Sequence, residues 1–193
     1  MIKKFIENNC TSYDSEIIVC SKLIETFGGN IIEIGAGVGE STAKFLEISR
    51  EYNVKTVVID PFEDGWDEMP SSYGRPYPYS TFVKNTLFCK DNLILHKVSS
   101  QTDGLIELLQ NEIPYSFSFV DGLQYDWAVL NDLNLMDSLK CRVICVDDYE
   151  RLTDVSQVRI AVDEFLKTKN YDLVVNLDPK RIRTKAFLIR NND

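Results

Sequence analysis

Short apolar stretches rich in β-branched residues alternate with helix-forming stretches along most of this 193-residue chain. Seven stretches are strand candidates, at residues 31–34, 56–59, 93–95, 117–120, 143–146, 173–177 and 186–189. Between them, residues 17–27 and 158–166 repeat apolar side chains at helical spacing; Ser12 or Asp14 would cap the first helix, and Gly28 would end it. Strands that alternate with helices favour a parallel sheet covered on both faces. We therefore expect an α/β fold with a doubly wound, seven-stranded, mostly parallel sheet, in one domain over residues 1–193.

Residues 61–80 interrupt this alternation. The segment contains four prolines, and among them stand the aromatic residues Trp66, Tyr73, Tyr77 and Tyr79. Proline spacing of this kind prevents a regular helix or strand, while the aromatic content is high for a plain linker. The segment is either a lid or substrate wall, or an excursion whose aromatic rings pack on the edge of the sheet.

Charge and rare residues narrow the class of function. The formal net charge of −9 argues against nucleic acid and anionic membrane surfaces as partners. The single histidine, His96, leaves little room for a zinc site or a catalytic triad. The five cysteines form no CxxC pair, and no segment is apolar enough for a signal peptide or a membrane span. We expect reduced thiols and a cytoplasmic protein.

A glycine-rich loop follows the first strand candidate and precedes a helix. Its glycines, Gly35, Gly37 and Gly39, allow a sharp turn and a close approach of the backbone to a ligand at the carboxyl edge of the sheet. A dinucleotide fingerprint would carry Gly or Ala where Glu40 stands, and no Gly-Lys-Ser/Thr of a P-loop follows. The loop therefore favours a ligand that is not polyanionic.

S-adenosylmethionine has the required charges. Loop N–H groups can bind its carboxylate, and Glu33 can face its cationic side. Asp60 ends the second strand candidate, 21 residues after Gly39, a spacing suited to an acid that accepts hydrogen bonds from ribose hydroxyls. The alternative is a tight strand-to-helix turn in which Asp60 caps its own loop.

The sequence resembles the class I S-adenosylmethionine-dependent methyltransferases, which have a Rossmann-like fold, over most of its length. Residues 33–39 match the first motif of the family, residues 58–63 match its ribose-binding strand end, and residues 99–101 match the adenine-contacting segment of catechol O-methyltransferase-like members. Together with residues 119–122 and 146–149, these motifs are most similar to the macrocin O-methyltransferase and cephalosporin-hydroxylase-like branch, which methylates hydroxyls of sugars and other natural products. The resemblance implies that the cofactor S-adenosylmethionine is held by Glu33, Gly35, Ala36, Gly37, Gly39, Asp60, Pro61, Ser100, Gln101 and Asp121.

Acidic residues follow the fourth and fifth strand candidates. If these strands are neighbours, Asp121, Asp147 and Asp148 converge at the edge that holds the glycine loop. Carboxylates that lie so close to one another need a cation or a shared proton, and a group of ligands made only of oxygen atoms suits Mg²⁺. In the metal-dependent catechol O-methyltransferase-like enzymes, the matching positions hold Mg²⁺, which binds the acceptor oxygens. The alternative is that Asp147 and Asp148 cap a turn, Asp121 contacts the cofactor and no metal binds.

Position 124 departs from the resemblance. Related families commonly place a histidine or lysine there as the proton acceptor, and Gln124 has no usable basicity. A metal can acidify the acceptor instead, Asp148 or Tyr125 can take the proton, or methyl transfer is lost while binding persists. We expect His96 to be packed or exposed on the surface rather than catalytic. The candidate catalytic residues are Asp121, Gln124 and Asp148.

The sequence thus predicts Mg²⁺-assisted O-methylation of a small-molecule acceptor, such as a sugar, polyol or catechol-like natural product. The alternatives are a metal-independent methyltransferase acting on another acceptor and a catalytically impaired cofactor-binding module. A homodimer is expected by family analogy alone. Two smaller features have two interpretations each. The basic residues 180–185 form a solvated turn or attract an anionic acceptor. Tyr125 and Trp127 line the acceptor pocket, or Trp127 belongs to the core.

Overall fold

A computed structural model describes residues 1–9, 14–62, 79–150, 156–176 and 184–191. Most of the expected lid, residues 63–78, lies outside the described residues, as do Ser12 and residues 180–183. The last two positions of the expected lid, Tyr79 and Ser80, belong instead to helix α4 (Tyr79–Thr86). Tyr79 begins a helix because its ring packs against Phe62 and Phe82 in a small apolar cluster, with ring centroids 5.0 and 6.2 Å away.

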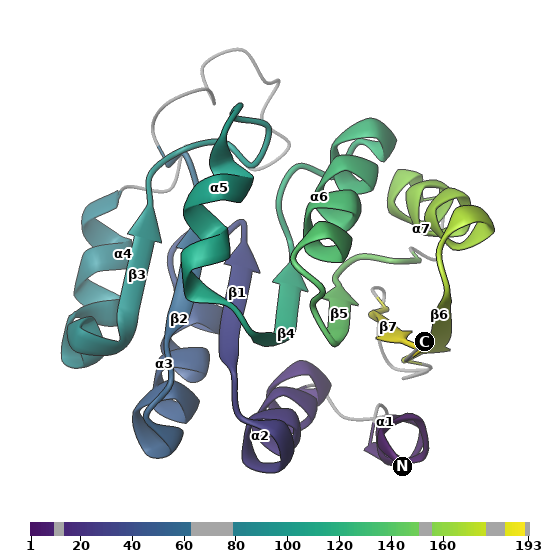
Figure 1. Ribbon diagram of the computed structural model, residues 1–193. Coiled ribbons are helices and arrows are strands. Elements are labelled where there is room, and N and C mark those ends of the chain that lie inside the picture. Colours follow the sequence, from purple (N-terminus) through teal and green to yellow (C-terminus); the bar gives the residue numbers. More distant parts are fainter. Residues whose placement is uncertain (10–13, 63–78, 151–155, 177–183, 192–193) are drawn as a thin grey trace.

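The described residues form one seven-stranded sheet in the order β3-β2-β1-β4-β5-β7-β6 (Figure 1). Strands β1 to β5 run parallel, and β7 runs antiparallel to both β5 and β6. The bounds are β1 Asn30–Ile34, β2 Thr56–Ile59, β3 Leu93–His96, β4 Tyr115–Val120, β5 Val143–Val146, β6 Tyr171–Val175 and β7 Ala186–Arg190. This architecture confirms the predicted α/β class and the mostly parallel sheet. Strand β6 lies two residues earlier than its apolar run predicts, because Tyr171 pairs with Arg190 of β7 and Val175 with Ala186.

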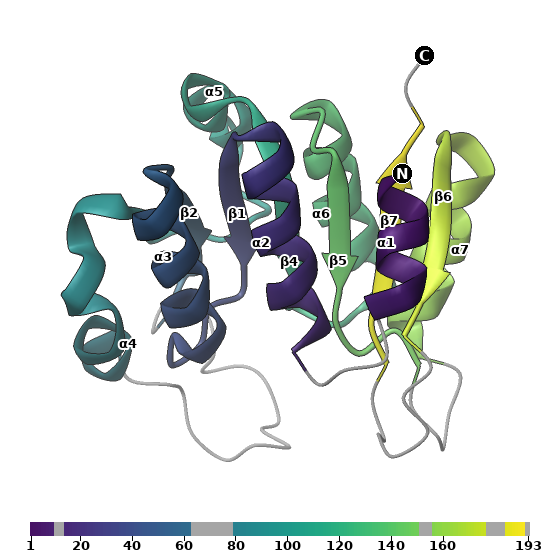
Figure 2. The ribbon, with the colours of Figure 1, turned by 90° about the horizontal axis from the view of Figure 1, so that it is seen from below.

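Helices cover both faces of the sheet (Figure 2). One face carries α1 (Ile2–Asn9), α2 (Ser15–Phe27) and α3 (Glu40–Tyr52), and the other carries α5 (Leu105–Leu109), α6 (Asp126–Ser138) and α7 (Gln157–Thr168). Short 3₁₀ helices, η1 (Leu87–Asn92) and η2 (Gln110–Glu112), precede β3 and β4. As predicted, α2 begins after Asp14 and is ended by Gly28, whose positive φ of 63° suits glycine, but the Asp14 side chain makes no hydrogen bond that caps the helix.

Side chains alternate between the two faces along each strand. Ile31, Phe117 and Cys145 belong to the core beneath α1, α2 and α3, where Phe45 of α3 packs against Phe117 with ring centroids 5.7 Å apart. Their strand neighbours, such as Ile32 and Ile144, belong to the core beneath α5, α6 and α7. This alternation also decides which face each residue at a strand end belongs to.

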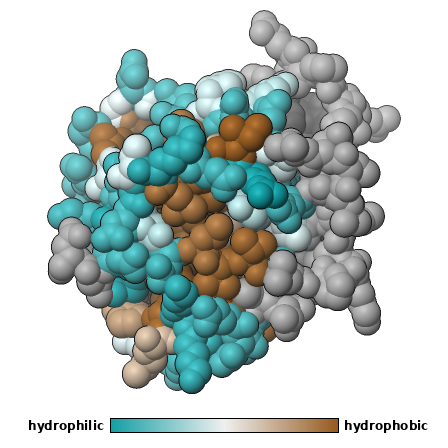
Figure 3. Space-filling model, turned by 90° about the vertical axis from the view of Figure 1, so that its right-hand side faces the viewer, coloured by the Kyte–Doolittle hydropathy of each residue, from teal (hydrophilic) through white to brown (hydrophobic). Residues whose placement is uncertain are grey.

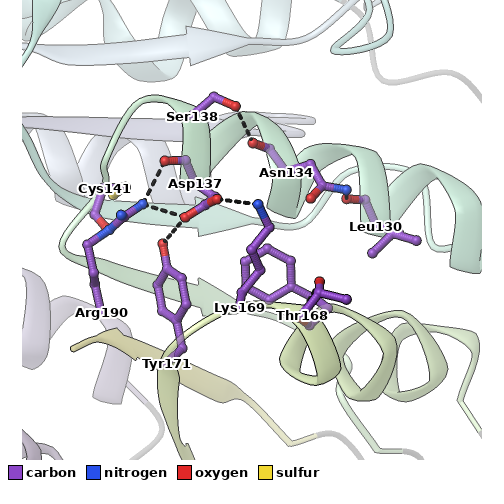
Figure 4. A network of polar contacts seen from close by, with 10 residues as sticks. Leu130, Asn134, Asp137, Ser138, Cys141, Thr168, Lys169, Tyr171 and Arg190 are labelled. Atoms are coloured by element: carbon purple, nitrogen blue, oxygen red, sulfur yellow. Dashed lines mark hydrogen bonds and ion pairs between the residues drawn. The ribbon is translucent and has the colours of Figure 1, made fainter. Parts of the chain in front are cut away.

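A polar cluster ties the ends of α6 and α7 to strands β6 and β7, at the edge of the sheet opposite the glycine loop (Figure 4). The carboxylate of Asp137 accepts hydrogen bonds from Lys169 at 2.7 Å, Arg190 at 2.6 Å and Tyr171 at 3.1 Å. Arg190 also donates to the backbone oxygens of Asp137 and Cys141. Burial alone would raise the pKa of Asp137, but the hydrogen bonds and cations around it lower that pKa below its usual value.

Strand β6 ends the sheet on the side viewed in Figure 3, where apolar atoms form a patch framed by polar ones. Leu173 and Val175 of β6 are half-buried against the core beneath α7. Among the described residues, no helix combines the length and apolar character needed to cross a membrane.

Candidate functional site

The glycine-rich loop lies between β1 and α3, at the carboxyl edge of the sheet. Gly35, Gly37 and Gly39 all have positive φ, at 85°, 52° and 81°. A Cβ on Gly35 would lie 2.3 Å from the backbone oxygen of Asp121, which follows β4. The loop therefore requires glycine at position 35 for two reasons, its left-handed backbone and its contact with the neighbouring strand end.

The carboxylate of Asp60 lies across this loop. Its Oδ2 accepts hydrogen bonds from the N–H groups of Ala36 at 2.7 Å and Gly37 at 3.0 Å, and its Oδ1 accepts one from Phe62 at 2.6 Å. Asp60 thus caps its own turn, as the alternative interpretation anticipated, and it also bonds the glycine loop. An ionised carboxylate has about four acceptor positions, and the backbone of the protein uses three of them here. Pro61 follows and is half-buried.

Glu33 lies behind the loop rather than on its open side. Its side chain has no exposed surface, and its two oxygens accept hydrogen bonds from Ser41 and Thr42 in the first turn of α3, each at 2.5 Å. Burial raises the pKa of Glu33 to about 7, although these two hydrogen bonds lower it. The strand alternation that turns Glu33 towards α3 makes it a support for the loop, so this structure does not place it towards a ligand's cationic side.

The expected adenine-contacting residues are held by an acid that the sequence analysis missed. Gln101 Nε2 donates to Oδ1 of Asp132 at 3.2 Å and to Oγ of Ser100 at 3.1 Å. Asp132 is 1% exposed in the middle of α6, and burial raises its pKa to about 7, against hydrogen bonds from Ser100 and Gln101. The sequence signal for Asp132 was an acidic residue at a core-facing position of a helix. Its partner Gln101 could not be predicted, because it lies 31 residues away in the sequence.

Two of the three expected acidic residues come together. Backbone hydrogen bonds from Asp121 to Ile34 and from Asp147 to Val120 extend the parallel ladder one residue past β4 and β5. Asp121 and Asp147 therefore continue the face beneath α2. Burial raises the pKa of both, and for Asp121 the nearby charge of Asp147 raises it further.

Asp148 takes a different direction. Its φ of 53° is left-handed, which reverses the chain after β5. The carboxylate of Asp148 is buried, and its Oδ2 accepts a hydrogen bond at 2.5 Å from Nε2 of Gln124. Gln124 and Asp148, two of the candidate catalytic residues, are thus hydrogen-bonded to each other, and the charge of Asp148 also raises the pKa of Asp121 and Asp147.

Lys185 is the second residue of this site whose role the sequence analysis missed. It precedes β7, is 5% exposed and forms an ion pair with Glu16 in the first turn of α2. The expectation of a solvated basic turn is therefore wrong at this position, because Lys185 continues an inward-facing strand position. Its charge lowers the pKa of both Asp121 and Asp147 against the effect of burial.

The acidic set does not fit a divalent ion in this arrangement. Within the described residues, no group of three or more His, Cys, Asp or Glu side chains is gathered closely enough to hold a metal. Asp148 bonds Gln124, and the charge of Lys185, whose ammonium pairs with Glu16, lowers the pKa of both Asp121 and Asp147.

Two aromatic side chains that follow Gln124 in the sequence lie on the surface. Trp127 is 57% exposed and Tyr125 is 40% exposed, and their rings stack with centroids 6.4 Å apart and planes at 8°. The interpretation of Trp127 as a core residue is wrong, because the buried face of α6 is formed by Ala128, Leu133 and Met136. His96 ends β3, half-buried and away from the strand ends of β4 and β5.

The strand order, the single antiparallel strand and the glycine loop bonded to the acid after β2 define the class I methyltransferase fold. Solved structures with this fold include O-methyltransferases. CalS11, a TDP-rhamnose 3′-O-methyltransferase of calicheamicin biosynthesis, matches with a TM-score of 0.64 and 15% identity, over 91% of this chain and 78% of that one. TomG of Streptomyces achromogenes is an O-methyltransferase of tomaymycin synthesis solved with S-adenosylmethionine. It matches with a TM-score of 0.63 and 13% identity, over 93% of this chain and 81% of that one.

A putative caffeoyl-CoA O-methyltransferase from Staphylococcus aureus matches with a TM-score of 0.63 and 16% identity, over 98% of this chain and 90% of that one. No protein-family model matches the sequence, and no curated protein matches it either. At these identities the likeness establishes the fold alone, which this chain shares with the O-methyltransferases named above.

Proposed function

We propose that this protein is an S-adenosylmethionine-dependent methyltransferase that methylates a hydroxyl group of a small molecule, such as a sugar, a polyol or a catechol-like natural product. The observation that carries the proposal is the bonding of the glycine loop to the Asp60 carboxylate, at the carboxyl edge of this sheet. Doubly wound folds bind their ligands at this edge. CalS11, TomG and the staphylococcal protein, all described as O-methyltransferases, support the same reaction class.

The cofactor residues divide into two groups. Asp60 holds the loop and offers its remaining acceptor position to a ribose hydroxyl, while Ser100 and Gln101 lie beyond β3 where adenine would bind. When bound, S-adenosylmethionine would supply the methyl group of its sulfonium, with the O–C bond to the acceptor formed in line with the C–S bond that breaks and S-adenosylhomocysteine as the leaving group. The protein contributes mainly by aligning the two reactants and excluding water.

The acceptor is proposed to lie against the stacked rings of Tyr125 and Trp127. Large exposed aromatic rings offer a flat apolar face with a polar rim, which suits a sugar or a phenolic ring. Tyr125 directly follows Gln124, whose amide donates to Asp148. This hydrogen bond orients the Asp148 carboxylate, which is the candidate to accept the hydroxyl proton.

Gln124 also supports a second candidate function. If methyl transfer requires a basic side chain at position 124, Gln124 cannot accept the proton, and the protein binds the cofactor without turnover. This cofactor-binding module differs from the enzyme only in the chemical step, so binding and catalysis must be measured separately.

Calorimetry with S-adenosylhomocysteine tests the shared premise. We expect saturable binding that weakens at least about tenfold in Asp60→Ala, with the exposed variant Asp91→Ala as the matched control. A folded wild-type protein that releases no heat would overturn both functions. Transfer of labelled methyl groups to a panel of sugars, polyols and catechols then separates the enzyme from the binding module.

A further inference from the structure

Lys185 lies directly opposite Asp147 across two antiparallel strands. The last pair of the β5–β7 ladder joins Val146 to Ala186, so the next residues are Asp147, directly after β5, and Lys185, directly before β7. The two segments stay in backbone contact beyond this point, where Tyr149 N–H donates to the Thr184 oxygen at 2.8 Å, one residue out of the ladder register after the left-handed Asp148. The register therefore places the two opposite charges at the same level of the sheet.

Both side chains belong to the face beneath α2. Lys185 is two residues before Phe187, and Asp147 is two residues after Cys145; both apolar residues belong to the core on this side. The Lys185 ammonium lies 5.7 Å from the ring centroid of Phe119, two residues before Asp121. Lys185 and the acids that follow β4 and β5 thus come from three neighbouring strands and share one face.

The surroundings hold Lys185 in place. Its side chain is almost wholly buried, and a buried ammonium is stable only beside compensating charge. Glu16 supplies one such charge from the first turn of α2, and it is itself only 6% exposed. Next to this pair, Asn176 N–H donates to the Lys185 oxygen, and the Asn176 amide donates to Ser15 Oγ. Both the side chain and the backbone of Lys185 are therefore held by neighbouring residues.

We propose that Lys185 is the resident cation of the acidic strand ends and fills the electrostatic place that Mg²⁺ has in the metal-dependent enzymes of this fold. A fixed ammonium near Asp121 and Asp147 compensates their charge and repels a second cation of higher charge. The proposal deepens the proposed function, and its catalytic part rests on that function. Its prediction about metal binding concerns the protein without cofactor or acceptor.

Binding of Mn²⁺, measured by electron paramagnetic resonance, and of Mg²⁺, measured by calorimetry, tests the proposal. We expect wild type to bind neither ion at millimolar concentration. Lys185→Met keeps most of the apolar stem but removes the charge, and should bind Mn²⁺ at least about tenfold more tightly than wild type. Lys185→Arg keeps the charge and should behave like wild type. Adding Asp147→Asn to Lys185→Met should abolish the gained affinity.

Wild type alone keeps the proposal falsifiable if Lys185→Met does not fold. Tight Mn²⁺ binding by wild type that disappears in Asp147→Asn would overturn the proposal, and so would equal affinity in wild type and Lys185→Met. Where turnover is found, a chelator should leave the wild-type rate unchanged. Failure of S-adenosylhomocysteine to bind would instead remove the proposed function and leave the metal result standing.

Discussion

Asp60 and Ala36, which are 24 residues apart, are joined by a hydrogen bond of 2.7 Å from the Ala36 N–H to the Asp60 carboxylate. The same oxygen also accepts the N–H of Gly37. The ends of β1 and β2 are thereby connected through one side chain, which fixes the conformation of the loop expected to bind the cofactor.

Removal of this carboxylate should affect both binding and stability. In Asp60→Ala, three buried or half-buried N–H groups lose their acceptor, which should lower the free energy of unfolding by about 2–4 kcal/mol. Urea denaturation measures this loss. Asp91→Ala, on the surface, should change it by less than about 0.5 kcal/mol. Equal stability of the two variants would show that Asp60 does not hold the loop.

Alanine substitutions at Gly28 and Gly35 distinguish the cost of backbone strain from the cost of steric overlap. Gly28 and Gly35 both have positive φ, but a Cβ on Gly28 meets nothing within 4 Å, whereas one on Gly35 meets the Asp121 backbone. Gly28→Ala should cost about 1 kcal/mol, and Gly35→Ala should cost more than about 3 kcal/mol or prevent folding. Thermal denaturation of both variants gives the comparison. Similar losses in the two would rule out the close contact.

Asp132 should make stability depend on pH near neutrality. Its pKa is about 7 in the folded protein against an ordinary 3.8, because burial disfavours the charged form. The folded state therefore binds more protons than the unfolded state between these values. The resulting contribution to stability is complete below about pH 4 and is lost as the pH rises to about 7.

Asp132→Asn removes this titration. Its unfolding free energy relative to wild type should rise by about 2–4 kcal/mol between pH 4 and pH 8, as followed by urea denaturation across that range. Asp103→Asn changes an exposed acid in the neighbouring loop and should show no such trend. A difference between Asp132→Asn and wild type that does not vary with pH would contradict the assignment.

Gln124→His tests the chemical step alone. An imidazole at this position supplies the basic group that related families commonly place there, so turnover on hydroxyl acceptors should rise, most clearly above pH 7. Initial rates with a labelled methyl donor measure the change, and S-adenosylhomocysteine affinity serves as the control. An unchanged rate in a variant that binds normally would argue against a missing base at position 124.

Asp137 should contribute to stability without affecting ligand binding. Asp137→Asn weakens the bonds to Lys169, Tyr171 and Arg190 and should lower the unfolding free energy by about 1–3 kcal/mol. Because the folded-state pKa of Asp137 is lowered, its contribution is present above its ordinary pKa and lost as the pH falls below it. Urea denaturation at pH 7 and pH 3 should therefore show a smaller difference from wild type at pH 3. A changed affinity of Asp137→Asn for S-adenosylhomocysteine would contradict this prediction, because it would mean that the substitution also disturbs the glycine loop at the opposite edge of the sheet.

Local patterns predicted the elements of this fold well. The β2 and β5 runs coincide with the observed strands, and the glycines placed the loop between β1 and α3. Such features depend on neighbours in sequence, namely side-chain alternation, glycine conformation and strand length. Trp127 shows the limit, since its helical spacing from Leu130 was compatible with the core and yet its side chain is exposed.

The sequence by itself determined the class of fold, the position of the glycine loop and the acids that follow strands β2, β4 and β5. Only the tertiary structure decided what those acids face. Asp60 bonds the glycine loop, Asp148 turns towards Gln124, and Lys185 lies opposite Asp147 because an antiparallel strand from the end of the chain enters the sheet beside β5. Charges brought together by strand register are distant in sequence, and their mutual compensation exists only once the sheet has formed.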